Sequence, residues 1–162
     1  MVDVNTHEEK LAEVLGLAMA AQEATKKVEG LVEDEEVNEV LSRMRDEAAE
    51  TQDRCEKLAD ARDGKKTAIL EKARETKSEA EEMMSTYLGS DAGGLDGLEF
   101  LTMAEAGEVG HWEILGKLSE EADESEISEL VEWALPIQEG HLDHARRASL
   151  KLAEQEDPYG TA

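Results

Sequence analysis

The chain has 162 residues, of which 36% are charged and 3% aromatic, and its formal net charge is −24. This charge argues against nucleic-acid binding, because phosphate contacts require clustered Lys and Arg, and equally against binding to an anionic membrane surface. No stretch approaches the roughly 18 uninterrupted apolar residues of a membrane-spanning helix.

The acidic excess has two interpretations. It suits a protein that stays soluble in concentrated salt, where screening removes the self-repulsion, but it also suits an ordinary coat of Glu on helices. We favour a halophilic protein, because nearly every predicted helix carries the excess on both sides. The single cysteine, Cys55, excludes an intramolecular disulfide. With a polar N-terminus that lacks a signal-peptide or basic targeting pattern, it predicts a cytoplasmic location.

Caps and breakers divide the sequence into five predicted helices within one domain covering residues 1–162. The expected helices span about residues 8–32, 36–62, 66–88, 97–121 and 125–155. The first begins at Thr6-x-x-Glu9, which has the form of a capping box. The apolar stripe of the second includes Cys55, which we therefore interpret as a core residue rather than a reactive thiol.

The third predicted helix is rich in Lys, Arg and Glu at spacings that allow i,i+4 pairs. The motifs Asp96-x-x-Glu99 and Asp123-x-x-Glu126 are expected to cap the last two helices. Short turns join the first two helices and the last two, so each pair is expected to form an antiparallel hairpin. A long crossover between hairpins is the connectivity of ferritin-like folds. The sequence therefore predicts an all-α, antiparallel four-helix bundle with an additional helix in the crossover.

Ionisable residues on apolar helix faces are informative, because a buried carboxylate or imidazole is costly unless it is paired or bound. In the fourth predicted helix, Glu108 lies in the middle of the apolar face, with His111 to its side and Glu105 one turn earlier. Glu-x-x-His spacing lets two side chains on adjacent turns converge on one metal ion. This helix is therefore a candidate source of metal ligands.

The last predicted helix carries a second set of polar residues. His141 lies at the centre of its inward face, His144 lies towards the edge, and Glu139 points away. Pairing across the connecting turn sets Glu105 and Glu108 level with His141. Two facing helices thus bring carboxylates and an imidazole to one depth, as a metal site inside a bundle requires.

The first hairpin contributes fewer inward-facing ligands. Glu47 borders the core face of the second helix, whereas Glu50 turns outward and Glu23 lies off the apolar stripe of the first. The helical faces therefore select four metal ligands: Glu47, Glu108, His111 and His141. The alternative is a hydrogen-bonded polar network or a site exposed to water, since single Glu-x-x-His motifs are common in a sequence with this much Glu.

Two segments resemble the ferritin-like superfamily, particularly its small stress-associated members of the YciE/YciF type. They are Glu47-Ala-Ala-Glu50-Thr51-Gln52 with Glu56 and Leu58 following, and Glu105-x-x-Glu108-Val109-Gly110 followed by His111-Trp112. The resemblance implies a bundle that holds a pair of iron or manganese ions between carboxylates and histidines. It places ligands at Glu23, Glu47, Glu50, Glu108 and Glu139.

The expected function is that of a ferritin-like metal-binding protein with one or two ions of iron or manganese, or of zinc. The resemblance implies an oxidoreductase acting on Fe(II), oxygen or peroxide in stress protection. A full di-iron pattern has two Glu-x-x-His motifs; here His141-x-x-His144 replaces the second. The alternative is a non-catalytic helical stress or scaffold protein with a metal-free polar core. A homodimer or higher homo-oligomer is compatible with both hypotheses.

Overall fold

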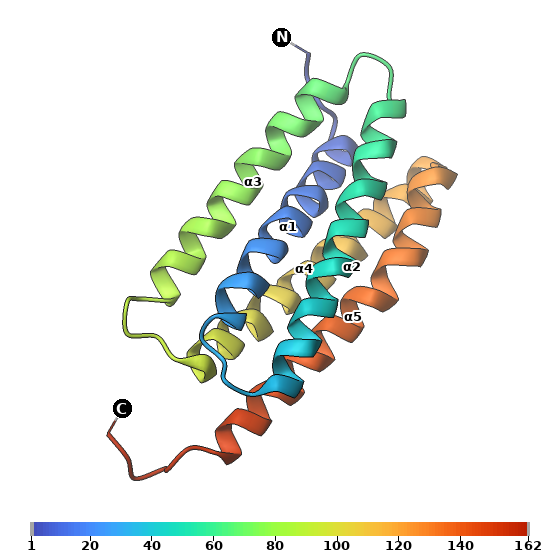
Figure 1. The fold of residues 1–162 in the computed structure, drawn as a ribbon. Coiled ribbons are helices and arrows are strands. Elements are labelled where there is room, and N and C mark those ends of the chain that lie inside the picture. The colour runs from blue at the N-terminus through green and yellow to red at the C-terminus, as the bar shows by residue number, and fades with distance from the viewer. Residues whose placement is uncertain (1, 162) are drawn as a thin grey trace.

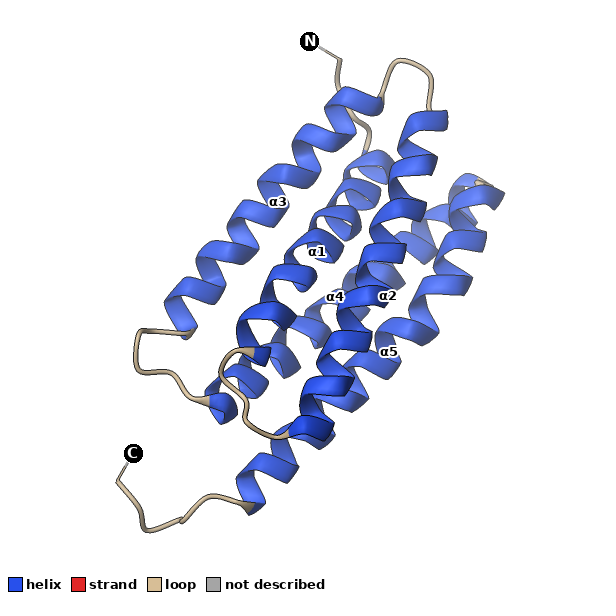
Figure 2. Cartoon of the chain, viewed as in Figure 1, coloured by secondary structure: helices blue, strands red, loops and turns tan. Residues whose placement is uncertain are grey.

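The computed structural model describes residues 2–161, and this part of the chain is all-helical, with five α-helices and no strand. The helices are α1 (Thr6–Glu29), α2 (Glu35–Ala61), α3 (Lys66–Tyr87), α4 (Gly94–Ala122) and α5 (Ser125–Glu154). They lie along a common long axis, and each runs opposite to the helix before it (Figures 1 and 2). Within the described range, no helix is both long and apolar enough to cross a membrane.

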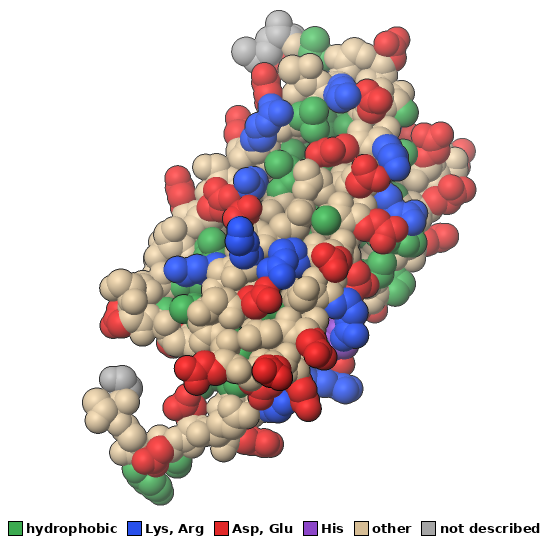
Figure 3. Space-filling model, viewed as in Figure 1, with side chains coloured by type: hydrophobic (Ala, Val, Ile, Leu, Met, Phe, Trp, Pro, Cys, Tyr) green, Lys and Arg blue, Asp and Glu red, His purple; other side chains and the backbone are tan. Residues whose placement is uncertain are grey.

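Helix α1 has the most extensive contacts with other helices: it packs against α2, α3 and α4. Helix α4 packs mainly on α5, and α5 also contacts α2. Helix α3 makes its main contacts with α1 and lies at one edge of the molecule in Figure 1. On the side of the molecule seen in Figure 3, Lys and Arg side chains are interspersed among Asp and Glu.

The helix caps differ from the expected ones. At α1, the side chain of Asn5 accepts a hydrogen bond from the Glu8 backbone N–H at 2.8 Å, and the Asn5 N–H donates to the Glu8 carboxylate at 3.0 Å. The expected box from Thr6 to Glu9 is wrong, because Asn5 is a strong N-cap one residue earlier. Asp123 ends α4 in the left-handed region with a φ of 54° and does not cap α5.

Helix α4 also starts earlier than expected. Asp96 accepts a hydrogen bond from the Gly93 N–H at 2.8 Å, so it closes the first turn from inside the helix. The prediction that Asp96 is the N-cap is therefore wrong. Asp96 nevertheless lies in the first turn of α4, where a carboxylate interacts favourably with the free backbone N–H groups and with the helix dipole.

The apolar core is divided into two clusters. One surrounds Leu11, Trp112 and Ile127, and the other surrounds Met44, Leu101 and Leu152. Cys55 belongs to the first cluster and is fully buried, which confirms its interpretation as a core residue. Burial raises the pKa of its thiol far above the usual range, which disfavours the thiolate form.

The gap between the clusters falls at the same level on four helices. Along α1, α2, α4 and α5, residues of one cluster occupy one half of the helix and residues of the other cluster occupy the other half. Polar side chains fill the level between them. We call the buried members on α4 and α5 the polar layer: Glu105, Glu108, Gln138 and His141.

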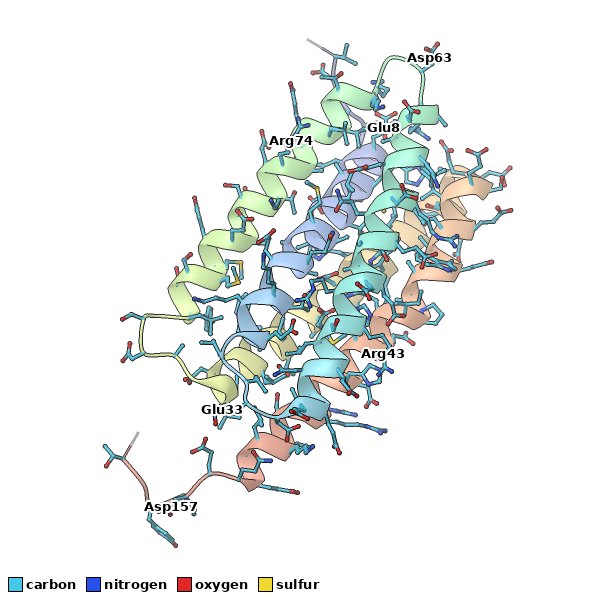
Figure 4. The ribbon with its side chains drawn as sticks, viewed as in Figure 1. Glu8, Glu33, Arg43, Asp63, Arg74 and Asp157 are labelled. Atoms are coloured by element: carbon cyan, nitrogen blue, oxygen red, sulfur yellow. The ribbon has the colours of Figure 1, made fainter. Side chains whose placement is uncertain are left out.

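Ionic contacts connect the helices at one end of the molecule. Arg62, just after α2, lies 3.1 Å from the buried Glu8 carboxylate and 3.4 Å from that of Glu124. Nε2 of His7 lies 2.7 Å from the Ser119 hydroxyl of α4. Figure 4 shows Glu8 at this end, near the α2–α3 connection that carries Asp63. These contacts hold α1, α2 and α4 in register along the long axis of the molecule.

Candidate functional site

The polar layer consists of four side chains that the packing removes almost completely from solvent. Glu105 and Glu108 of α4 are 1% and 5% exposed, and Gln138 and His141 of α5 are 4% and 2% exposed. Glu105 faces Gln138 and His141 across the contact between α4 and α5, and Glu108 lies one turn further along α4. A carboxyl buried in this way is costly unless it is protonated, hydrogen-bonded or bound to a cation.

His141 is the central member, because each of its ring nitrogens faces a different carboxylate. Nε2 lies 3.4 Å from Oε1 of Glu47 on α2, and Nδ1 lies 3.9 Å from Oε2 of Glu105. The side-chain amide of Gln138 donates a 2.5 Å hydrogen bond to the same Glu105 oxygen. Three helices thus contribute to one row of groups: Glu47, His141, Glu105 and Gln138.

Burial sets the protonation states in this row. It raises the pKa of Glu105 to about 8, against the opposing effect of the Gln138 hydrogen bond. It raises the pKa of Glu108 well above its usual range, and the neighbouring Glu105 carboxylate raises it further. Burial lowers the pKa of His141, although the Glu47 carboxylate opposes this effect. At pH 7 these directions favour protonated carboxyls at 105 and 108 and a neutral imidazole.

No basic side chain within residues 2–161 forms an ion pair with Glu105 or Glu108, apart from the distant contact between Glu105 and His141. Glu47 differs, since its side chain is 35% exposed and retains contact with water. The layer therefore combines one solvated carboxylate with two buried carboxyls that have no cationic partner.

The four ligands selected from the helical faces separate into two places. Glu47 and His141 are in contact, and Glu108 lies in the same layer, one turn from Glu105. His111 lies outside the layer: its Nδ1 donates to the Gly107 carbonyl at 2.8 Å, and its Nε2 lies 3.7 Å from Glu13 of α1. The Glu108-x-x-His111 pair is therefore not brought together with His141.

The remaining candidates lie mainly on the surface. Glu23, Glu50 and Glu139 are exposed, as the helical faces predict, and Glu50 pairs with Arg54 at 3.0 Å. His144 is partly buried, and its charge contributes to lowering the pKa of His141. Within residues 2–161, none of these four side chains forms a hydrogen bond or ion pair with the Glu105 or Glu108 carboxyl.

Gln138 lies on the face of His141 one turn earlier, and the structure shows that it is hydrogen-bonded to Glu105. The spacing of three residues already places the two side chains on one face, but an amide carries no charge and so gives a weaker signal than Glu or His. On the other side of the core, Gln22 donates to Gln52 at 2.6 Å, and Gln52 donates to Glu56 at 2.9 Å. The first hairpin thus supplies mainly amides at this level.

The layer has the right donor atoms for a metal but not a complete set of ligands. Among the residues that the structure describes, no three His, Cys, Asp or Glu side chains form a group that could hold one ion. Two donors that share a tetrahedral ion lie about 3.4 Å apart, given bonds of about 2.1 Å. The separation of 3.4 Å between His141 and Glu47 matches this value, and that of 3.9 Å between His141 and Glu105 exceeds it slightly. The two carboxylates face different ring nitrogens, so a single ion beside His141 cannot contact both of them, and the Glu47 side gives the closer fit.

Comparisons of the chain with protein-family models, curated proteins and solved structures give no match. The functional conclusion therefore depends on the fold and the polar layer alone. Together they define an all-helical protein with a buried cluster of carboxyl and imidazole groups.

Proposed function

We propose that the chain is a ferritin-like protein that binds one divalent metal ion in its polar layer. In this proposal α1, α2, α4 and α5 form the four-helix bundle, and α3 is the additional helix of the crossover. The contacts of α1 with α2 and α4, and of α5 with α2 and α4, support this arrangement. The position of α3 at the edge, beside α1, also supports it.

One observation carries the metal proposal: Glu105 and Glu108 are buried side by side without a Lys or Arg partner within the described chain. Two such carboxyls lower the stability of the core as soon as they ionise, unless a cation enters. His141 and Glu47 supply the nitrogen and oxygen donors that iron, manganese and zinc accept. A cation next to His141 would therefore convert an electrostatic cost into a stabilising interaction.

Each residue has a distinct role in the proposed site. His141 provides a ring nitrogen, and Glu47 provides a carboxylate that is already in contact with water. Gln138 orients Glu105 by its hydrogen bond, as second partners of metal ligands do. Glu108 adds negative charge next to Glu105. A bound iron or manganese ion would supply redox chemistry toward Fe(II), oxygen or peroxide.

Proton release tests this proposal. Because Glu105 is protonated at pH 7, cation uptake should expel about one proton or more per ion. Calorimetric titration with Mn(II) in two buffers of different ionisation enthalpy measures that number. Glu105→Gln and His141→Gln should abolish binding, whereas Glu139→Gln, an exposed control on α5, should bind as the wild type does. Equal binding by all four proteins would contradict the proposal.

The second candidate is a non-catalytic helical protein whose polar core holds no metal. The observation that favours it is the lack of a three-ligand group within the described residues. In that case the Gln138 amide satisfies the protonated Glu105 carboxyl. A ligand that binds only the folded state raises its melting temperature, so an identical melt with Mn(II) and with chelator would favour this candidate.

A further inference from the structure

A cavity adjoins the polar layer at Glu105 and Glu108 and lies between α4, α1 and α3. Its volume is about 180 Å³, which is small compared with the pockets that hold drug-sized ligands. Its walls are mostly apolar, and the ionisable residues that also line it are Glu81, Glu105, Glu108 and His111. Helix α1 contributes Leu17 and three alanines, and α3 and α4 contribute the remaining apolar residues: Ala80, Met83, Met84, Phe100, Leu101, Met103 and Ala104.

The carboxyl of Glu108 is the buried polar group of this cavity that lacks a partner. The residue is 5% exposed and lines the cavity, yet no side chain or backbone group within residues 2–161 forms a hydrogen bond with its carboxyl. In the same part of the chain, Asn38 Oδ1 is the one enclosed side-chain polar atom without a partner. The Glu108 carboxyl is therefore not enclosed, and its free space is the cavity.

The two buried carboxyls differ in this respect. Glu105 is bound by Gln138 and faces His141 of α5, whereas Glu108 has no such contact. At the rim, Glu81 of α3 is paired with Lys77 at 3.3 Å, so its charge is compensated. An incoming ammonium group thus finds one carboxyl without a hydrogen-bond partner at the buried wall of a mostly apolar cavity, and Glu108 would release its proton as the ammonium binds.

The mouth of the cavity exposes apolar side chains. Met83 and Met103 are among the few large apolar residues of the described chain that are strongly exposed, at 54% and 39%. Flexible thioether side chains adapt to ligands of different shape. Because α3 makes its main contacts with α1, its two methionines and Met103 of α4 flank an opening rather than a closed interface.

We propose that this cavity binds a small primary amine with an apolar body. The ammonium group would donate hydrogen bonds to Glu108, and the hydrocarbon would pack among the alanines and methionines. An acid is disfavoured, because the chain has a net charge of −24 and Glu108 lies at the buried wall. A bare metal ion is disfavoured as well, because most of the wall is apolar and the other polar residues already have partners: Glu105 contacts Gln138, His111 contacts the Gly107 carbonyl, and Glu81 contacts Lys77.

The methionines provide the probes for a test. Of the six in the sequence, Met83, Met84 and Met103 line the cavity, and Met44 lies buried in the second apolar cluster. The protein is labelled with ¹³C at its methionine methyl groups and titrated with hexylamine in the presence of chelator. The resonances of the three cavity methionines should shift and saturate, while that of Met44 stays unchanged.

Variants separate recognition of the cation from simple apolar filling. Glu108→Gln should weaken hexylamine binding roughly tenfold or more, the effect of losing a charged hydrogen bond. Glu113→Gln, an exposed change of equal charge on α4, should leave the affinity unchanged. Ala80→Leu, which fills the cavity from α3, should also abolish binding. The melting temperature of each variant shows that it is folded.

Three results would overturn the proposal: no saturable shift, equal affinity for hexylamine and hexanol, or wild-type affinity in Glu108→Gln. Since chelator is present throughout, none of these results depends on the proposed metal. A failure of metal binding at His141 would in turn leave the amine titration unaffected.

Discussion

Gln138 donates a 2.5 Å hydrogen bond to the Glu105 carboxyl and thereby joins α5 to α4 inside the core. Replacing Gln138 with Leu should leave the buried carboxyl without its partner. The cost is about 1–3 kcal/mol of the free energy of unfolding, the typical penalty for an unsatisfied buried polar group. Urea denaturation measures it.

A double variant serves as the control for that prediction. Adding Glu105→Leu to Gln138→Leu removes the stranded carboxyl, so it should restore part of the lost stability. If Gln138→Leu alone unfolds at the urea concentration of the wild type, the hydrogen bond makes no net contribution to the core.

The raised pKa of Glu105 predicts how stability depends on pH. In the unfolded chain the carboxyl titrates near its usual value, whereas in the folded protein its pKa is about 8. The folded state therefore holds more protons between these two values. Its stability should be greatest at the acidic end of this window and fall as the pH rises to 8, by a few kcal/mol in order of magnitude.

Glu105→Gln should reduce this loss, because an amide does not titrate. The measurement is the free energy of unfolding of wild type and variant at pH 5.5 and pH 8, with chelator present. Exposed Glu50→Gln is the control. His141 acts in the opposite direction, since its pKa is lowered and its stabilising effect is lost as the pH falls. An equal decline in wild type and Glu105→Gln would contradict the protonation states described above.

Gly16 allows α1 and α3 to approach each other closely. A Cβ atom at this position would meet Cβ of Thr76 at 2.8 Å, as well as the backbone of Ala73. Gly16→Ala should therefore displace α3 and cost about 1–3 kcal/mol. Gly110→Ala on α4 is the matched control: its Cβ would meet nothing within 4 Å, and it should gain up to about 1 kcal/mol in helix propensity. Equal effects in urea denaturation would mean that this contact does not position α3.

Arg62 contacts two carboxylates, those of Glu8 and Glu124, of which Glu8 is buried. Arg62→Met should leave Glu8 with the more distant Lys65, at 3.6 Å, and cost about 1–3 kcal/mol. Arg146→Met, at an exposed pair with Asp143, should change stability by less than about 1 kcal/mol. Thermal melts of the two variants at equal ionic strength measure the difference.

The sequence predicts the helices and their inward faces well, because both follow from local periodicity. Glu108 and His141 are buried as their positions on the apolar stripes predict, and Trp112 packs in the core. Glu105, which was expected to flank the site, is the most buried carboxyl. A separation of three residues leaves two side chains at similar angles, so small rotations of a helix decide which is central.

Local periodicity does not predict which side chains of different helices become neighbours. Periodicity places His111 near the inward face of α4, but the position of α1 gives it Glu13 as a neighbour instead of His141. The cavity next to Glu108 exists because α3 lies along α1. The close contact between α1 and α3 at Gly16 cannot be predicted before α3 is known to be the neighbouring helix. Cap positions were misjudged by a few residues, because several adjacent polar residues can serve as the cap.

The most direct test of the central claim is the metal content of the protein. It is purified in high salt without chelator and loaded anaerobically with Fe(II), beside Glu105→Gln and His141→Gln, before elemental analysis. The proposal predicts about one equivalent of metal in the wild type and its loss in both variants. No bound metal in the wild type, or equal amounts in all three proteins, would contradict a metal site in the polar layer.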